Sequence, residues 1–236
     1  MEIQKLEKAE KRTLDIQWVK EHLVCRLVNR KNNEELLKEI PYRKFYDLAI
    51  VYYVPMQQVE DGMLFWTIRK EQAEVLGLEE ESLFTLALEN TRRRFPIQFT
   101  ALEQAIRQFT LEAGIDLEEE CKCDEEAETG QETGGMYLLS NTFHTYGAVA
   151  MLYPDVWEGI ADRFQSDLII LPSSCHEVLV LPYTEEISVS DLAEIVFTVN
   201  RECVAPEDML SDSVYLYRRK EKRIVMAGRT EQEEIK

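Results

Sequence analysis

The densest group of reactive side chains lies in one short polar turn between two apolar stretches. After Pro172 the turn holds Ser173, Ser174, Cys175, His176 and Glu177. A serine or cysteine nucleophile with a histidine base is the arrangement of many hydrolases, and a third group must orient the base. Cys175 and His176 are sequence neighbours, however, and adjacent strand residues point to opposite faces. The pattern therefore favours a structural turn whose hydroxyls bind backbone groups, with a hydrolase that uses Cys175 as the alternative.

Two further cysteines, Cys121 and Cys123, could supply thiolates to a metal ion. A closed zinc site needs four ligands, usually in two pairs. His144 and His176 could complete such a site, but nothing in the sequence brings them to these cysteines. The chain also lacks glycine-rich phosphate loops, the G-x-S-x-G nucleophile motif and the H-E-x-x-H zinc motif. We therefore expect exposed thiols, with no metal and no cofactor.

Residues 112–135 differ from the rest of the chain in composition. They hold ten acidic side chains and one lysine, a charge of −9 that is half of the net charge of −18. The composition is typical of a solvated loop. The alternative is an acidic arm that binds a basic protein partner, with the contacts made by Glu118, Glu119, Glu120, Asp124, Glu125 and Glu126.

The overall composition excludes several classes of protein. Of the 236 residues, 45% are hydrophobic, so the chain can bury a core. Because 45 acidic side chains outnumber 27 basic ones, direct nucleic-acid binding is disfavoured. No apolar run reaches the length of a membrane span, and no signal peptide is evident at the start. Five cysteines at irregular spacing fit a reducing compartment, so we expect a cytoplasmic protein.

The first half of the chain reads as mostly helical with one hairpin. Apolar residues recur every three to four positions over residues 1–40, which predicts helix. A buried strand over 46–56 and its partner over 63–68 form the predicted hairpin. Three helices follow over residues 69–76, 79–95 and 100–113, the first closed by Gly77 and the last beginning with a Thr100–Glu103 capping box.

The second half predicts two hairpin–helix units and a final hairpin. The expected strands cover 136–141, 148–153, 167–171, 177–181, 213–217 and 223–227, and the expected helices 155–164 and 189–201, the second with Ser190 as its cap. The fold class is therefore α+β, with an antiparallel sheet and helices packed on one face. The expected division is a helix-rich part over 1–113, the acidic loop over 114–135, a second part over 136–228 and a tail over 229–236, or one single domain.

Two sets of polar residues have simple structural explanations. Arg92, Arg93 and Arg94 end a helix, where cations interact favourably with the helix dipole. Capping is the expected role of five residues at the ends of predicted elements, which are Asn90, Asn141, Asp208, Asp212 and Tyr217.

Several stretches together resemble a known family. They are VCRLVNRKNNEELLKEIPYRKFYDLAIVYYV at 24–54, LGLEEESLFTLALENTRRRFP at 76–96, MYLLSN and GAVAMLYP within 136–154, SDLIILPSSCHEVLVLP at 166–182 and VAPEDMLSDSVYLYRR at 204–219. Their order resembles domain-of-unknown-function family 5688, from Firmicutes, and more distantly family 1444. The resemblance implies an α+β fold and a bacterial, cytoplasmic protein of a family that is often encoded on mobile elements. It implies no activity and no catalytic residue.

Three hypotheses about function follow. The leading one is a cytoplasmic protein-binding or regulatory module that acts through its acidic surface. The second is a hydrolase with its site at the turn from Ser173 to Glu177. The third is a structural member of a larger complex that makes contact through its N-terminal helix. The sequence does not set the oligomeric state.

Overall fold

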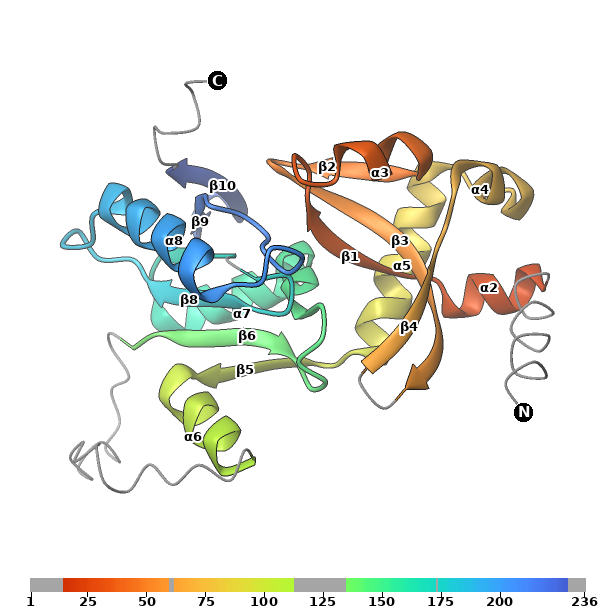
Figure 1. Ribbon diagram of the computed structural model, residues 1–236. Helices are drawn as coiled ribbons and strands as arrows, with labels where there is room; N and C mark the ends of the chain where they lie inside the picture. The colour runs from red at the N-terminus through yellow and green to blue at the C-terminus, as the bar shows by residue number, and fades with distance from the viewer. Residues whose placement is uncertain (1–14, 60–61, 113–134, 173, 229–236) are drawn as a thin grey trace. The chain divides into compact units, whose positions relative to one another are not determined.

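The computed structural model describes residues 15–59, 62–112, 135–172 and 174–228 (Figure 1). The chain divides into two compact units, one through Pro96 and one from Ile97 onward. Each unit has its own antiparallel sheet with helices beside it. The α+β class with antiparallel sheets is thus confirmed. The predicted division at residues 113 and 135 depends on the acidic segment, which lies outside the described residues, and it stays a prediction.

The first unit is built around one long strand. Its elements are α2 (Ile16–His22), β1 (Val24–Asn29), α3 (Glu34–Glu39), β2 (Tyr42–Phe45), β3 (Leu48–Val59), β4 (Gly62–Thr67), α4 (Lys70–Leu76) and α5 (Glu80–Arg94). β3 pairs antiparallel with β1, β2 and β4. The hairpin that the sequence predicted is confirmed as β3 and β4. The prediction of continuous helix over the first 40 residues is wrong, because residues 24–29 form a strand of the sheet.

Buried polar contacts hold the helices of this unit together. The Asn90 side-chain amide donates to the backbone oxygens of Lys20 and Leu23, each at 2.9 Å. These two oxygens lie at the end of α2, so Asn90 fastens α2 to α5. Asn90 therefore lies within α5 rather than at its end, and its amide caps the end of a different helix, α2, through a tertiary contact.

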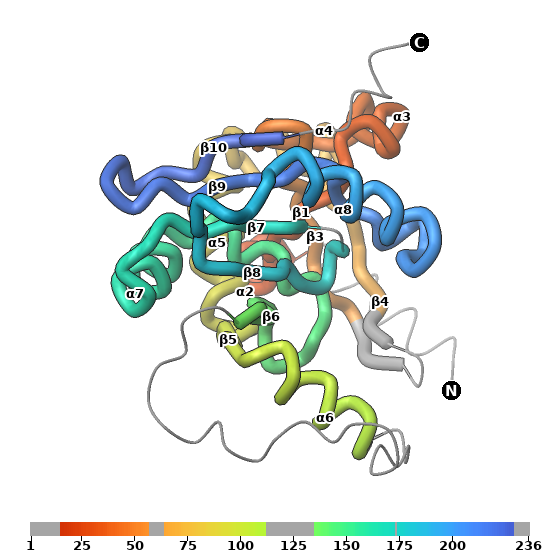
Figure 2. Tube along the Cα trace, turned by 90° about the vertical axis from the view of Figure 1, so that its left-hand side faces the viewer, coloured from red at the N-terminus to blue at the C-terminus, as the bar shows by residue number. Residues whose placement is uncertain are grey.

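The second unit contains a six-stranded sheet. Its elements are β5 (Ile97–Ala101), α6 (Leu102–Glu112), β6 (Tyr137–Asn141), the 3₁₀ helix η1 (Gly147–Leu152), α7 (Pro154–Phe164), β7 (Leu168–Leu171), β8 (Val178–Pro182), α8 (Val189–Cys203), β9 (Val214–Arg218) and β10 (Arg223–Gly228). The strand order is β10-β9-β7-β8-β6-β5, which Figure 2 shows from top to bottom. The outer strand β10 has an irregular register between Met226 and Gly228.

Helices cover both faces of this sheet, so the predicted packing on one face is wrong. α8 packs on a cluster that includes Ile169 and Leu216. On α7, Trp157 stacks on Tyr217 with ring centroids 6.2 Å apart. Leu216 and Tyr217 are neighbours in β9 and therefore point to opposite faces. Figure 2 shows α7 and α8 on opposite sides of the strands.

Three local predictions are corrected. Residues 148–153 form no strand, because 147–152 are the 3₁₀ helix η1, and β6 pairs instead with β5 and β8. Thr100 lies in β5, a strand that the sequence analysis missed. Ser188 caps α8 by accepting a hydrogen bond from the Asp191 N–H, so the cap is not Ser190. By contrast, Gly77 ends α4 in the left-handed conformation as predicted. Within the part of the chain described, no helix is both long and apolar enough to span a membrane.

Candidate functional site

Three loops meet at one end of the six-stranded sheet. They are residues 142–146 after β6, 172–177 between β7 and β8, and 204–213 before β9. The antiparallel pairing of β6 with β8 and of β7 with β9 brings these strand ends together. Most of the buried polar side chains of this unit lie in or beside these loops, namely Ser140, Asn141, Ser174, Ser211, Asp212 and Ser213. We call this region the three-loop junction.

Backbone hydrogen bonds hold two of these loops side by side. Ser174 and Met209 form an isolated antiparallel bridge. The Cys175 N–H donates to the Asp208 backbone oxygen at 2.8 Å, and the Ser211 N–H donates to the Pro172 oxygen at 2.9 Å. The side chains of Cys175 and Asp208 are thereby fixed next to each other, although 33 positions separate them in the sequence.

The third loop reaches the junction through a glycine. The Gly147 N–H and the Ser140 hydroxyl both donate to the His176 backbone oxygen, at 2.8 and 2.7 Å. A Cβ atom on Gly147 would lie 2.3 Å from Ser140 Oγ, 2.5 Å from that oxygen and 2.8 Å from the Asn141 nitrogen. Only glycine allows this approach.

Three reactive side chains converge at the junction. Asp208 Oδ1 lies 3.1 Å from His176 Nε2 and 3.6 Å from Cys175 Sγ. The three potential ligand atoms all lie within 4.8 Å of one another. The other imidazole nitrogen, Nδ1, accepts the Tyr146 N–H at 3.2 Å. Nε2 therefore carries the hydrogen and donates it to Asp208, which gives a hydrogen-bonded chain from Tyr146 to Cys175.

This arrangement does not assemble a nucleophile with its base. A base must accept the proton of the thiol, but the free lone pair of His176 faces the Tyr146 amide and its Nε2–H faces Asp208. The thiol of Cys175 donates to the carboxylate instead. Ser174 is buried, and its hydroxyl accepts the His176 N–H at 3.0 Å.

The expectation that Cys175 and His176 point apart is wrong. Both lie in a bend rather than in a regular strand, so the alternation of side chains does not apply to them. Asp208, which was predicted to be only a cap, is the residue that joins them. The signal available in the sequence was its residue type alone.

Of the remaining predicted site residues, His144 is described by the structure and does not join this cluster. His144 makes a ring contact with Phe109 at 4.9 Å between centroids. Ser173, the thiols of Cys121 and Cys123, and the acidic residues of the proposed arm lie outside the described residues.

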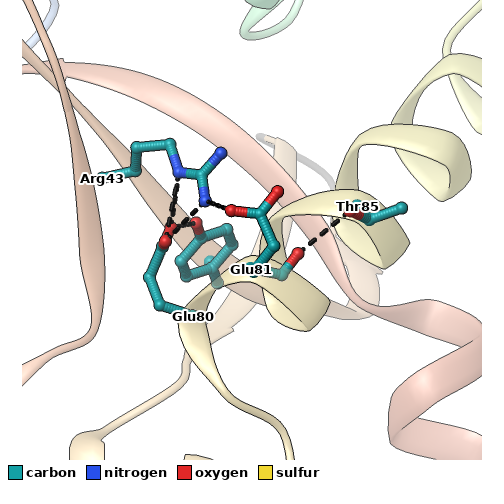
Figure 3. Close-up of polar contacts among 5 residues, drawn as sticks. Arg43, Glu80, Glu81 and Thr85 are labelled. Atoms are coloured by element: carbon teal, nitrogen blue, oxygen red, sulfur yellow. Dashed lines mark hydrogen bonds and ion pairs between the residues drawn. The ribbon is translucent and has the colours of Figure 1, made fainter.

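The first unit contains a second polar cluster, shown in Figure 3. Arg43 on β2 donates two hydrogen bonds from Nε and Nη2 to Glu80 at 2.9 and 2.6 Å, and it also pairs with Glu81. The Tyr52 hydroxyl donates to Glu80 at 2.6 Å. The guanidinium carbon of Arg43 lies 4.1 Å from the centre of the Phe84 ring. The cluster ties two strands to the first turn of α5.

The titration behaviour of this cluster fits a structural role. Partial burial raises the pKa of Glu80, but the hydrogen bonds from Arg43 and Tyr52 outweigh burial and hold this pKa below its ordinary value. Burial and the bond to Glu80 raise the pKa of the Tyr52 phenol. Glu80 therefore stays ionised, and its carboxylate oxygens are occupied by Arg43 and Tyr52. A group that transfers protons needs a pKa near the working pH and access to the substrate, so this arrangement does not suit that role.

The other two described cysteines, Cys25 and Cys203, differ in exposure. Cys25 on β1 is completely buried beside Thr91, whose hydroxyl accepts the Cys25 N–H at 2.9 Å. Burial raises the pKa of this thiol to about 12. Cys203, at the end of α8, is exposed. Cys25 is thus a core residue, whereas Cys203 is a surface thiol.

The fold and the junction define an α+β protein with two antiparallel sheets and a hydrogen-bonded Cys–His–Asp cluster at the end of one of them. The chain belongs to the family of unknown function DUF5688, whose model matches residues 2–219. No curated protein and no solved structure matches it.

Proposed function

We propose that this protein is a binding module that acts through a protein partner rather than through covalent chemistry. The observation that carries the proposal is the surface of α6. Three large apolar side chains on this helix are substantially exposed, Ile106 at 47%, Phe109 at 42% and Leu111 at 79%. Phe143, in the loop that contacts Phe109 through His144, is 61% exposed. Ile106 and Phe109 lie one turn apart on the same side of α6, whereas Leu111 lies on the other side of the helix. Exposed apolar side chains such as Ile106, Phe109 and Phe143 are typical of a surface that a partner covers.

The charge of the neighbouring sequence indicates the chemistry of the partner. α6 leads directly into the ten acidic residues of 112–135. A partner with basic side chains around an apolar strip would complement both features. The contacts that we propose for the acidic arm are those of Glu118, Glu119, Glu120, Asp124, Glu125 and Glu126.

The setting of the protein belongs to the same proposal. We place it in a bacterial cytoplasm, supported by the irregular cysteine spacing and by the family resemblance. The distant relation to family 1444 and the association with mobile elements remain predictions. The contact through the N-terminal helix is a prediction as well.

The test compares variants of the tagged protein in affinity capture from a bacterial lysate. The partner should be retained at about 50 mM salt and released at about 500 mM, because exposed charges are screened at high ionic strength. Neutralising the six acidic contacts should abolish capture. Replacing Phe109 by serine should do the same at unchanged charge.

The matched control neutralises exposed acidic residues elsewhere, Glu185, Glu186 and Glu194. This variant should capture the partner normally. If all variants and the wild type retain the same proteins in the same amounts, the α6 surface and the arm have no part in binding.

The alternative function is a hydrolase at the turn from Ser173 to Glu177. Its support is the convergence of Cys175, His176 and Asp208. A nucleophilic Cys175 should react with iodoacetamide at pH 7 much faster than free cysteine does. Reaction of Cys175 at or below the rate of free cysteine, measured in a background where Cys121, Cys123 and Cys203 are serine, would exclude this function.

A further inference from the structure

The Cys–His–Asp cluster supplies three different kinds of metal ligand. Sulfur, imidazole nitrogen and carboxylate oxygen are all ligands that Zn²⁺ accepts. The ligands come from two loops that backbone hydrogen bonds hold together, so the ligand positions are fixed before any ion arrives. Cys175 is buried, whereas the side chains of His176 and Asp208 are 29% and 37% exposed. An ion could therefore enter from the His176 side.

We propose that Cys175, His176 and Asp208 bind one Zn²⁺ ion and leave its fourth position open to water or to a ligand atom of a partner. In a tetrahedral site, bonds of about 2.3 Å to sulfur and about 2.0–2.1 Å to nitrogen and oxygen place S and O about 3.6 Å apart and N and O about 3.3 Å apart. The corresponding distances are 3.6 Å from Cys175 Sγ to Asp208 Oδ1 and 3.1 Å from His176 Nε2 to the same oxygen. These two distances are thus close to those of a zinc site, and all three ligand atoms lie within 4.8 Å of one another.

Zinc binding changes two hydrogen positions. Cys175 gives up its thiol proton to solvent, because the thiolate is the ligand. His176 must free Nε2 for the ion, so its hydrogen moves to Nδ1. Nδ1 then no longer accepts the Tyr146 N–H, and that hydrogen bond breaks. One proton is released for each ion bound.

The loop that carries Tyr146 is suited to such a shift. His144 and Tyr146 have φ angles of 49° and 53°, a left-handed conformation that non-glycine residues adopt at a cost. Tyr146 also stacks on the His176 ring, with centroids 5.4 Å apart. Zinc binding is therefore coupled to the position of the 144–146 loop, and the Tyr146 amide reports on it.

The experiment uses the full-length chain with Cys121 and Cys123 replaced by serine, so that these thiols contribute no ligand. Co²⁺ is the first probe, since a thiolate ligand gives a sulfur-to-cobalt charge-transfer band. Isothermal titration with Zn²⁺ in two buffers of different ionisation enthalpy then counts the protons released. Amide NMR follows Tyr146.

We expect a charge-transfer band at one equivalent of Co²⁺, one proton released per Zn²⁺ and a large shift of the Tyr146 amide signal. Cys175→Ser should remove the band, and Asp208→Asn should weaken Zn²⁺ binding by at least the roughly 10- to 100-fold typical of losing a supporting residue. The matched controls, Cys203→Ser and Glu207→Gln, change an exposed thiol and the acidic neighbour of Asp208. Both should bind as the parent does.

Three results would overturn the proposal. They are the absence of a charge-transfer band, a band that persists in Cys175→Ser, and Zn²⁺ affinity that falls equally in Glu207→Gln and Asp208→Asn. Circular dichroism of the metal-free variants checks the fold. Should Cys175→Ser not fold, Asp208→Asn, which keeps the side-chain shape, decides the question. The outcome is independent of partner binding, because none of these residues lies on α6.

Discussion

Replacing Gly147 by alanine should be among the most destabilising single-methyl additions in the second unit. The new Cβ would meet Ser140 Oγ, the His176 oxygen and the Asn141 nitrogen at 2.3, 2.5 and 2.8 Å. Ser140 can rotate away, but it then loses its hydrogen bond to the His176 oxygen, worth about 1 kcal/mol. The other two atoms belong to the backbone, so the loops themselves must move.

The magnitude follows from these contacts. Forcing an extra methyl group into a packed site costs about 1–3 kcal/mol. Alanine also restricts the unfolded chain, which returns roughly 0.4–1 kcal/mol. With the lost Ser140 bond, we expect a net loss of about 1–3.5 kcal/mol, or roughly 2–14 °C in Tm at about 2–4 °C per kcal/mol.

The matched control is Gly159→Ala on α7, where a Cβ would meet no atom within 4 Å. Alanine is the better helix former, so this variant should gain about 0.5–1 kcal/mol. The assay is urea unfolding followed by the emission of the buried Trp157, in a background where Trp18 and Trp66 are phenylalanine. If the two alanine variants unfold within about 0.5 kcal/mol of each other, the close approach of Gly147 does not exist in solution.

Three further predictions concern the first unit. With its pKa raised to about 12, Cys25 should remain unmodified by iodoacetamide in the native protein while Cys203 is alkylated, as mass spectrometry of peptides will show; equal labelling would contradict its burial. The pKa of Glu80 is lower in the folded protein than in the unfolded chain. Ionised Glu80 therefore stabilises the fold at any pH above its unfolded-state pKa, and this contribution is lost as the pH falls through its folded-state pKa. Glu80→Gln should therefore cost up to about 1 kcal/mol at pH 7, given its partial exposure, and the difference from wild type should shrink below pH of about 4 in urea titrations. Asn90→Ala should cost about 1–3 kcal/mol, because the buried Leu23 carbonyl and the partly buried Lys20 carbonyl lose this donor, whereas the exposed Glu89→Ala should change stability by no more than about 0.5 kcal/mol.

The spacing of apolar residues in the sequence located most helices and strands, but it did not always tell a helix from a strand. The stretch at 148–153 is apolar at every position, and a short apolar run fits a buried strand and a buried helical turn equally well. Full burial of residues 147–152 explains the pattern. Apolar residues at 19, 23 and 27 matched a helical repeat, but residues 24–29 form the strand β1 because each of them pairs with a residue of β3. Pairing with a distant strand leaves no local signal.

The candidate site also depends on contacts between distant parts of the chain, which the sequence does not show. Cys175 and His176 were singled out because reactive residue types are dense in that turn. Asp208 could not be connected with them, because the bridge between Ser174 and Met209 that aligns their loops is a tertiary pairing. The sequence analysis applied the alternation of a strand to Cys175 and His176, although they lie in a turn, and so placed the two side chains on opposite faces. In the structure they face the same carboxylate.

The irregular register of β10 has a consequence for the behaviour of the protein at high concentration. An outer strand presents backbone groups to which a strand of another molecule can add. The break between Met226 and Gly228 interrupts the regular spacing of these groups near the end of β10. At its other end, residues 218–223 carry five basic side chains, and four of them pair with carboxylates, Arg218 with Asp167, Arg219 with Asp162, Lys222 with Glu158 and Arg223 with Glu221. Charged side chains at an outer strand oppose the addition of another strand, because they would lose their hydration. The irregular register and the charged side chains thus both oppose strand addition at β10, and replacing the charged side chains of 218–223 by neutral ones should lower the concentration at which the protein aggregates.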